Sequence, residues 1–419
     1  MSKVDAIINI CRTFMVCCLL GFSSYYFNRD SRRLVLDPLE RMMERIQLIA
    51  ENPMALCGDD DQGEGVLAFG KKKKKKADGD NEAQLLETSL IKIGKLLGLC
   101  FGVAGSQIIG QNMATKKGSK DFNPQSGNKI MSIFGFCDIR GFGEVTEVLQ
   151  AKIMTFVNSI AEVVHKSVDQ YSGASNKNLG EAFLFVWKFP ESEVEYFDGE
   201  VQIIEGSEQC TFTAEFAVMS FLKCISKINQ YKHILEYSRD PRLTAVIPGF
   251  KVNMGFGLHY GWAIEGAIGS HFKIDASYLS PNVNIAARLE VATRQYGILI
   301  LISGELHDLC SEEFQNLMRC VDVATVKGSA VPMRFFTINL NTDHMKETDY
   351  DLLDKTIKEK KESWKKTKQE TKMKIFERVC TTYQMMMDDP DFALMFPQGT
   401  EEFDQTYKEA FNQYVKGDW

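Results

Sequence analysis

The stretch from Phe134 to Gly143 reads Phe-Gly-Phe-Cys-Asp-Ile-Arg-Gly-Phe-Gly, and it places one carboxylate, Asp138, at the end of an apolar β-like run beside glycines. A second stretch, from Asn176 to Val186, reads Asn-Lys-Asn-Leu-Gly-Glu-Ala-Phe-Leu-Phe-Val and does the same with Glu181. Mg²⁺ prefers hard oxygen ligands and is usually held by one or two carboxylates together with substrate phosphates. The two stretches therefore predict a site for divalent cations and a polyphosphate, and hence a nucleotide-handling enzyme.

Length and composition limit the protein class. The 419 residues are 44% hydrophobic and 25% charged, which is enough for a sizeable core with appendages. A net charge of −7 argues against a nucleic-acid partner, because a dedicated nucleic-acid-binding domain is usually basic. The eleven cysteines show no CxxC pair or metal-ligand spacing, which favours free thiols in a reducing compartment. Cys137 is interpreted as a small buried hydrophobe rather than a nucleophile.

The N-terminal segment, residues 1–28, is interpreted as a transmembrane or membrane-edge helix. Its apolar run ends in Tyr25-Tyr26-Phe27 and is followed by arginines, which predicts a cytoplasmic C-terminal side. Arg12 interrupts the run, and a central arginine is costly in lipid, so an interfacial or packed soluble helix stays an alternative. We therefore expect a membrane-associated protein with a cytoplasmic catalytic region. A cilium is compatible with this expectation, but no feature of the sequence assigns it.

Four further segments flank the middle of the chain. Residues 29–52 are predicted to form a signalling helix, either as one of a helical pair or as a single amphipathic helix. Residues 53–82 form a flexible linker, whose Lys71–Lys76 run is either a solvated tract or a binding site for anionic lipid. Residues 83–127 are a helical transducer segment. Residues 343–419 are a charged helical extension, whose aromatic stripe indicates packing or a protein partner.

The middle of the chain alternates between strand and helix patterns. Asp138 and Glu181 each lie between two such patterns. The order β-α-β-β-α-β is the split βαβ arrangement, an α+β fold with helices expected on one face. The expected strands are 130–139, the hairpin around Leu179-Gly180-Glu181 with 183–187, then 252–260, 263–268, 298–303, 321–326 and 333–340. Helices are expected around 149–163, 214–228 and 281–293, and the acidic segment 190–208 is expected to be a loop.

Residues 128–342 resemble the catalytic domain of class III nucleotidyl cyclases, a ferredoxin-like βαββαβ fold. Four motifs carry the resemblance in the family's order: Phe136-Cys-Asp-Ile-Arg-Gly-Phe-Gly143, Lys177-Asn-Leu-Gly-Glu181, Asn284-Ile-Ala-Ala-Arg-Leu-Glu290 and Val326-Lys-Gly328. The segment from Ser270 to Pro281 is also similar to that of adenylyl cyclases from protists such as ciliates and apicomplexans. The resemblance implies a cyclase whose substrate is a nucleoside triphosphate. The ribose 3′-hydroxyl of the substrate attacks its own α-phosphate, and pyrophosphate is expelled.

The resemblance also implies a set of site residues. It gives two Mg²⁺ ions per site, with Mn²⁺ as an alternative, held by Asp138, Glu181 and the backbone of Ile139. Backbone amides of the following turn would hold the triphosphate, at Ile139, Gly141, Phe142 and Gly143. Two metals between carboxylates stabilise both the attacking and the leaving oxygen. The remaining catalytic positions would be Asn284 for the ribose, Arg288 for the α-phosphate and Lys327 for the polyphosphate.

Lys177 favours ATP as the substrate. In the family, adenylyl cyclases carry lysine at this position and guanylyl cyclases carry glutamate. A lysine only donates hydrogen bonds, so it suits N1 of adenine and not the N1–H of guanine. Asp275 and Ser277 remain alternatives for the second purine-reading position, since either could accept a bond from the adenine amino group.

Two departures from the family pattern qualify the implied activity. Glu181 stands where the family has aspartate, and Gly143 stands where it usually has threonine.

The resemblance implies a homodimer, because the metal carboxylates and the purine-reading residues of one site come from opposite subunits. We thus expect an adenylyl cyclase that makes 3′,5′-cyclic AMP. The alternatives are a guanylyl cyclase and a catalytically weak, cyclase-like regulatory or scaffold module.

Overall fold

A computed structural model describes residues 3–32, scattered positions between 36 and 105, and then 127–197, 199–270, 273–327, 331–343, 345–347, 381–396 and 401–416. The chain divides into two compact units, Met1–Asn123 and Pro124–Trp419. The predictions for the linker and the lysine tract lie outside the described residues, as does most of the two helical segments on either side of them. The second unit carries every residue of the predicted site.

The first unit contains one long described helix, α1 (Lys3–Ser31). Its stretch Ile7–Ser31 is long and apolar enough to cross a membrane, by length and composition alone. Phe14, Leu20 and Phe27 are exposed along it, in keeping with a helix whose apolar side chains have no protein partner among the described residues.

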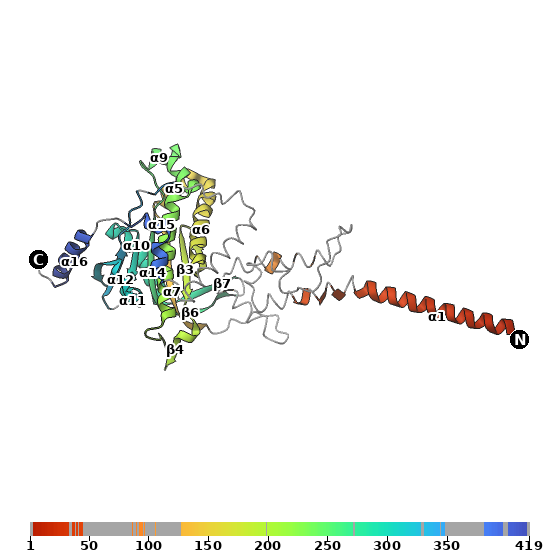
Figure 1. Ribbon diagram of the computed structural model, residues 1–419. Coiled ribbons are helices and arrows are strands. Elements are labelled where there is room, and N and C mark those ends of the chain that lie inside the picture. The colour runs from red at the N-terminus through yellow and green to blue at the C-terminus, as the bar shows by residue number, and fades with distance from the viewer. Residues whose placement is uncertain are drawn as a thin grey trace. The chain divides into compact units, whose positions relative to one another are not determined.

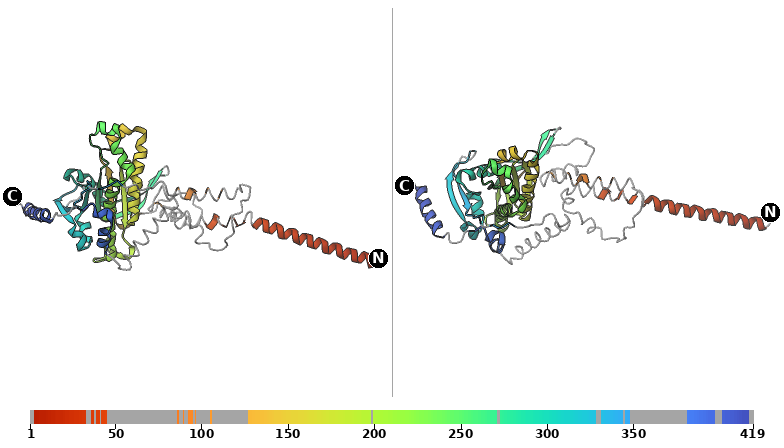
Figure 2. Two further views of the ribbon diagram at one scale, coloured as in Figure 1. Left: turned by 45° about the horizontal axis from the view of Figure 1, so that its top comes forward. Right: turned by 90° about the horizontal axis from the view of Figure 1, so that it is seen from above.

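The second unit is built on one eight-stranded sheet in the order β2-β3-β1-β6-β8-β10-β9 (Figure 1). Its strands are β1 (Asn128–Ile139), β2 (Ala174–Leu179), β3 (Ala182–Lys188), β6 (Met254–Ser270), β8 (Ile300–Ser303), β9 (Met318–Ala324) and β10 (Met333–Ile338). The remaining strand, β7 (Lys273–Leu279), pairs with the far half of β6, and this hairpin projects from the sheet (Figure 2). Strands β6 and β8 are parallel, whereas β1 runs antiparallel to both of its neighbours. The α+β fold predicted from the sequence is confirmed.

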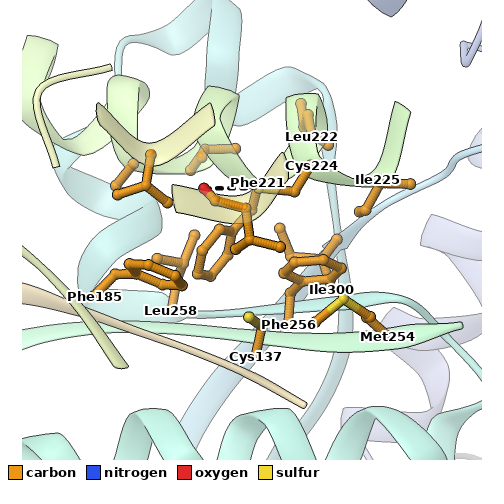
Figure 3. Close-up of a cluster of buried hydrophobic side chains, with 14 of the residues drawn as sticks. Cys137, Phe185, Phe221, Leu222, Cys224, Ile225, Met254, Phe256, Leu258 and Ile300 are labelled. Carbon is orange, nitrogen blue, oxygen red and sulfur yellow. Dashed lines mark hydrogen bonds between the residues drawn. The ribbon is translucent and has the colours of Figure 1, made fainter. Parts of the chain in front are cut away.

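One face of the sheet is covered by the long helices α6 (Ile153–Gln170) and α7 (Glu208–Gln230). Side chains of successive strand residues point to opposite faces. Gly135 of β1 faces α7, because a Cβ there would lie 2.6 Å from the Phe221 ring. Cys137 points the same way and is fully buried, as predicted (Figure 3). Asp138, three residues after Gly135, therefore points to the opposite face.

That opposite face carries α10 (Pro281–Tyr296), so the expectation that all helices lie on one face is wrong. The helix begins where Ser280 Oγ accepts from the Asn282 amide, and it ends at Gly297 with φ of 67°. Three glycines of β6 let it approach the sheet closely. A Cβ at Gly257 would lie 2.3 Å from the Ala286 carbonyl oxygen, so a side chain at this strand position would exclude the helix.

Other differences from the expected elements are local. The segment 190–208, expected as a loop, contains a hairpin of β4 (Val194–Phe197) and β5 (Glu200–Ile203). The two strands expected at 252–260 and 263–268 are the single strand β6, because Gly261 keeps its ladder pairing with Ser132. The helix expected around 149–163 is α6, and a separate helix, α5 (Phe142–Leu149), precedes it and ends before Gln150, which has a positive φ of 50°. The strand β7 was not expected at all.

Part of the C-terminal extension belongs to the core of the second unit. Helices α14 (Thr382–Met387) and α15 (Pro390–Ala393) bring Met386, Phe392 and Met395 into the same buried cluster as α6 and α7. Lys223 of α7 contacts Asp389 at 2.6 Å and Asp391 at 2.5 Å, which fixes this segment to the helix. The last helix, α16 (Glu401–Lys416), carries the expected aromatic stripe, and Arg319 of β9 lies over its Tyr407 ring.

Candidate active site

Asp138 ends β1 on the face that carries α10. Only 7% of the residue is exposed, and its Oδ2 accepts a hydrogen bond from the guanidinium of Arg294 near the end of α10. Its other oxygen, Oδ1, is buried and has no partner among the described residues. Burial and the nearby Glu181 raise the pKa of Asp138, against the opposing effect of Arg294. Asp138 is thus a buried carboxylate that has one oxygen without a described hydrogen-bond partner and lies close to the charges of Glu181 and Arg294.

Glu181 is held beside Asp138 by the hairpin between β2 and β3. Gly180 provides the positive φ of 78° that the turn requires, and Glu181 follows it in an exposed position. The Glu181 carbonyl oxygen accepts from the Ile139 amide at 3.1 Å, and Asp138 pairs with Ala182 across the ladder. The structure therefore brings together the two carboxylates that the sequence singled out.

A third carboxylate, Glu290 of α10, lies next to Asp138 and was not predicted as a site residue. It is 2% exposed, and its Oε1 has no described partner. Burial and Asp138 raise the pKa of Glu290 to about 7, although Arg294 and Arg140 oppose this shift. The available signal in the sequence was Gly255, Gly257 and Gly261 on one face of β6, because glycines there mark a strand face on which another element lies closely.

Arg140 braces the turn that follows Asp138. Its Nη2 donates to Thr293 Oγ1 at 2.9 Å and to the Ile298 carbonyl at 2.7 Å. Its own amide donates to the Asn253 carbonyl at 2.9 Å. These bonds tie the turn to the C-terminal end of α10 and to the loop before β6. Sequence reasoning had assigned Arg140 no role.

The turn itself presents backbone amides. Gly141 adopts φ of 68° and is the N-cap of α5, so the chain reverses directly into a helix. The first amides of a helix lack intrahelical acceptors, and with the helix dipole they form a ready site for phosphate. Phe142 and Gly143 begin α5, and the space around Gly143 is open. The geometry is compatible with the predicted triphosphate-binding turn.

Lys177 and Asp275 meet although they are distant in the sequence. Lys177 Nζ of β2 lies 3.9 Å from Asp275 Oδ2 of β7, and Lys273 Nζ lies 3.5 Å from the same oxygen. The side chain of Asp275 is 48% exposed, whereas Ser277 is only 8% exposed. Of the two alternatives left by the sequence, Asp275 is therefore the one placed beside Lys177.

The other predicted catalytic side chains make no described bond with the two carboxylates. Asn284 is exposed and Arg288 half-buried on α10, while Lys327 is exposed in the turn after β9. Within the part of the chain that the structure describes, none of the three forms a hydrogen bond or ion pair with Asp138 or Glu181. The roles of these three residues stay predictions.

The carboxylates suit a divalent cation with further ligands from elsewhere. Asp138 offers an unpartnered, buried oxygen, and Glu181 offers an exposed carboxylate next to it. Hard cations such as Mg²⁺ take such oxygens and complete their shell with water and phosphate. No group of three or more His, Cys, Asp or Glu side chains among the described residues could hold a metal. Glu290 is a buried neighbour of Asp138 in this arrangement.

The family is decided by the sequence profile of the adenylate and guanylate cyclase catalytic domain, which matches residues 125–340, slightly more than half of the chain. The chain belongs to this family. A second profile, that of the all-helical domain of RasGEFs, matches residues 1–114. The cyclase family thus accounts for the sheet, for α10 and for all residues of the predicted site.

Curated relatives of the cyclase region are adenylate cyclases. The chain is 28% identical over 197 residues to adenylate cyclase of Anabaena cylindrica, which covers 46% of this chain and 34% of that protein. It is 25% identical over 217 residues to the terminal-differentiation specific adenylate cyclase of Dictyostelium discoideum, covering 50% of this chain and 9% of that protein. The chain therefore spans about a third of the length of the first relative and about a tenth of the second.

Solved structures of cyclases are also similar to this chain. A bacterial light-regulated adenylyl cyclase matches with a TM-score of 0.45 and 21% identity, covering 62% of this chain and 64% of that one. The guanylyl cyclase Cya2 matches with a TM-score of 0.37 and 17% identity, covering 51% of this chain and 94% of that one.

Proposed function

We propose that the protein is an adenylyl cyclase that converts ATP into 3′,5′-cyclic AMP and pyrophosphate. The observation that supports ATP is the pair of Lys177 and Asp275, 3.9 Å apart on β2 and β7. A lysine donates and an aspartate accepts, which matches N1 and the 6-amino group of adenine. Guanine presents the reverse pattern at these two positions. The pair would therefore bind adenine with both groups satisfied and guanine with neither.

In this proposal the reacting end of the nucleotide lies at the carboxylates. Two divalent cations between Asp138 and Glu181 would supply charge stabilisation for the attacking and leaving oxygens. Asp138 is oriented by Arg294, and the turn carrying Phe142 and Gly143 is braced through Arg140, so both are preorganised before the nucleotide arrives. Preorganised donors aimed at developing charge are a large part of enzymatic catalysis.

The remaining groups come from a second copy of the chain. Asn284 and Arg288 lie four residues apart on α10 and share one of its faces. In a two-fold dimer, Asn284 of one copy would position the ribose held by the carboxylates of the other copy. Arg288 would neutralise charge at the α-phosphate, and Lys327 would neutralise charge on the leaving pyrophosphate. The lack of any described hydrogen bond or ion pair between these three side chains and the carboxylates of the same copy is compatible with this arrangement.

The same proposal covers the rest of the chain. Residues 128–342 would form the catalytic domain, attached to a membrane through the helix in residues 1–28. Residues 29–52 and 83–127 would connect the membrane end to the catalytic dimer across the linker 53–82. The extension 343–419 would pack on the domain through α14 and α15 and offer α16 to a protein partner.

The test is cyclic nucleotide production by the purified full chain with ATP or GTP, each with Mg²⁺ or Mn²⁺. Cyclic AMP from ATP, lost in Asp138→Ala, is the expected result. Preferential turnover of GTP would replace the proposal by a guanylyl cyclase. An inactive wild-type protein with an active Glu181→Asp variant would identify a module disarmed at its second carboxylate. Inactivity of both folded proteins would leave only a binding or scaffold function.

A further inference from the structure

Two arginines, Arg140 and Arg294, lie close to the carboxylates at the end of β1, which are those of Asp138, Glu181 and Glu290. The two guanidinium groups differ in how they are held. The guanidinium of Arg140 is fixed by two hydrogen bonds to Thr293 and Ile298 at 2.9 and 2.7 Å. The Arg294 side chain is 51% exposed, and its one described hydrogen bond is to Asp138. Arg140 therefore braces the fold, whereas Arg294 can move into solvent when its partner is taken.

Arg294 and a divalent cation would use the same carboxylate. Asp138 is the less exposed member of the pair, with a side-chain exposure of 10%, so a cation on Oδ1 and the guanidinium on Oδ2 would share one largely buried carboxylate. Its second oxygen is buried without a described partner. A cation bridging Asp138 and Glu181 would place at least two positive charges next to the guanidinium. Such charges repel strongly at a partly buried site, where screening is weak.

We propose that Arg294 is a displaceable counter-cation of Asp138, which competes with the divalent cation and must leave the carboxylate when the cation binds. The inference rests on the proposed function, because it takes Asp138 as a cation ligand. Arg294 is thus a positioning residue that keeps the buried carboxylate paired until the site is loaded. The fixed Arg140 then remains as the counter-charge for Glu290.

The chain offers a matched control in Arg334. Its side chain is 49% exposed and forms an ion pair with Asp308, so it resembles Arg294 in exposure and pairing. Arg334 lies in β10, and it is not part of the cluster of Asp138, Glu181 and Glu290. Exchanging either arginine for glutamine removes one half-exposed positive charge from the same unit.

The experiment measures Mn²⁺ binding to the full-length protein at pH 8 without nucleotide, by electron paramagnetic resonance of the free ion. Arg294→Gln is expected to lower the dissociation constant about tenfold, as the loss of one nearby charge predicts. Arg294→Lys and Arg334→Gln should stay within about twofold of the wild type, and Asp138→Asn should abolish the site. Unchanged or weaker Mn²⁺ binding in Arg294→Gln, or Mn²⁺ binding that does not depend on Asp138, overturns the proposal.

A second measurement uses the wild-type protein, so it does not depend on a variant that folds. Phenylglyoxal modifies accessible arginines, and peptide mass spectrometry reports the rate at each position. Mn²⁺ should accelerate modification of Arg294 and leave Arg334 unchanged. Equal rates at Arg294 with and without Mn²⁺ overturn the proposal. Arg294→Gln can tighten Mn²⁺ binding as expected while the protein forms no cyclic nucleotide. In that case the proposed enzymatic function fails and this inference stands.

Discussion

Gly255 lies directly across the β1–β6 ladder from Asp138, and its missing side chain makes the space that the Glu290 carboxylate occupies. A Cβ at Gly255 would lie 2.3 Å from Glu290 Oε1 and 2.7 Å from Thr293 Oγ1. The space beside the strand position opposite Asp138 is thus occupied by a helix side chain. For this reason helix α10 packs directly on the face of the sheet that carries Asp138.

Gly255→Ala should destabilise the second unit by about 1–3 kcal/mol, because the added methyl group must displace a buried carboxylate and a buried hydroxyl. Chemical unfolding in urea measures the change. Gly143→Ala is the control, since a Cβ there meets nothing within 4 Å and its φ is not in the left-handed region. Equal stability of the two variants would show that α10 does not pack on Gly255 as described.

The raised pKa of Glu290, about 7, predicts a pH-dependent stability. Between the ordinary pKa of a glutamate and 7, the folded state keeps a proton that the unfolded state releases. Stability should therefore fall by up to about 3 kcal/mol as the pH rises from about 5 to 8. Glu290→Gln should flatten this profile, measured by urea unfolding in EDTA, while the exposed Glu191→Gln should keep it. Identical slopes in the wild type and Glu290→Gln would contradict the assignment.

Asp275 and Ser277 can be separated by their effects on purine choice. Asp275→Asn should reduce kcat/KM for ATP about ten- to a hundredfold and lower the ATP-to-GTP ratio, because it removes a charged acceptor beside Lys177. Ser277→Ala should change kcat/KM for ATP by less than about threefold, since this serine is largely buried. A larger effect of Ser277→Ala would assign the purine-reading role to the serine.

The shared site of the proposed homodimer predicts complementation between inactive variants. Asp138→Ala and Arg288→Ala should each be inactive, because each removes one half of both sites. When equal amounts are dissociated and allowed to reassociate at random, half of the dimers are mixed, and each mixed dimer has one intact site. About a quarter of the wild-type activity should return. No recovery in a mixture shown to contain mixed dimers would exclude sites built from two subunits.

The docked C-terminal segment should contribute to the stability of the catalytic unit. Phe392 is fully buried in the core cluster, so Phe392→Ala should lower the free energy of unfolding by about 3–5 kcal/mol. Leu394, two residues on, is 50% exposed, and Leu394→Ala should cost less than about 0.5 kcal/mol. Similar stabilities of the two variants in urea unfolding would mean that residues 381–396 do not belong to the core.

Short-range patterns explain which elements could be predicted. Strands β1 and β3 carry mostly apolar runs next to glycines, so both strands and the turn at Gly180 were expected where they lie. Strand β7 was not expected, although Ile274, Ala276 and Tyr278 alternate with polar residues, because three apolar positions in a seven-residue segment are a weak strand signal. It is held by pairing with β6, and pairing partners cannot be read from a strand alone.

The sequence by itself determined the candidate residues for binding a cation and a phosphate, because Asp138, Glu181 and the glycine turn are local motifs. Only the tertiary structure decided what surrounds them. Glu290 and Arg294 reach Asp138 through the packing of α10 on β6, across more than a hundred intervening residues. Charge interactions depend on distance in space and on burial, and neither follows from spacing along the chain.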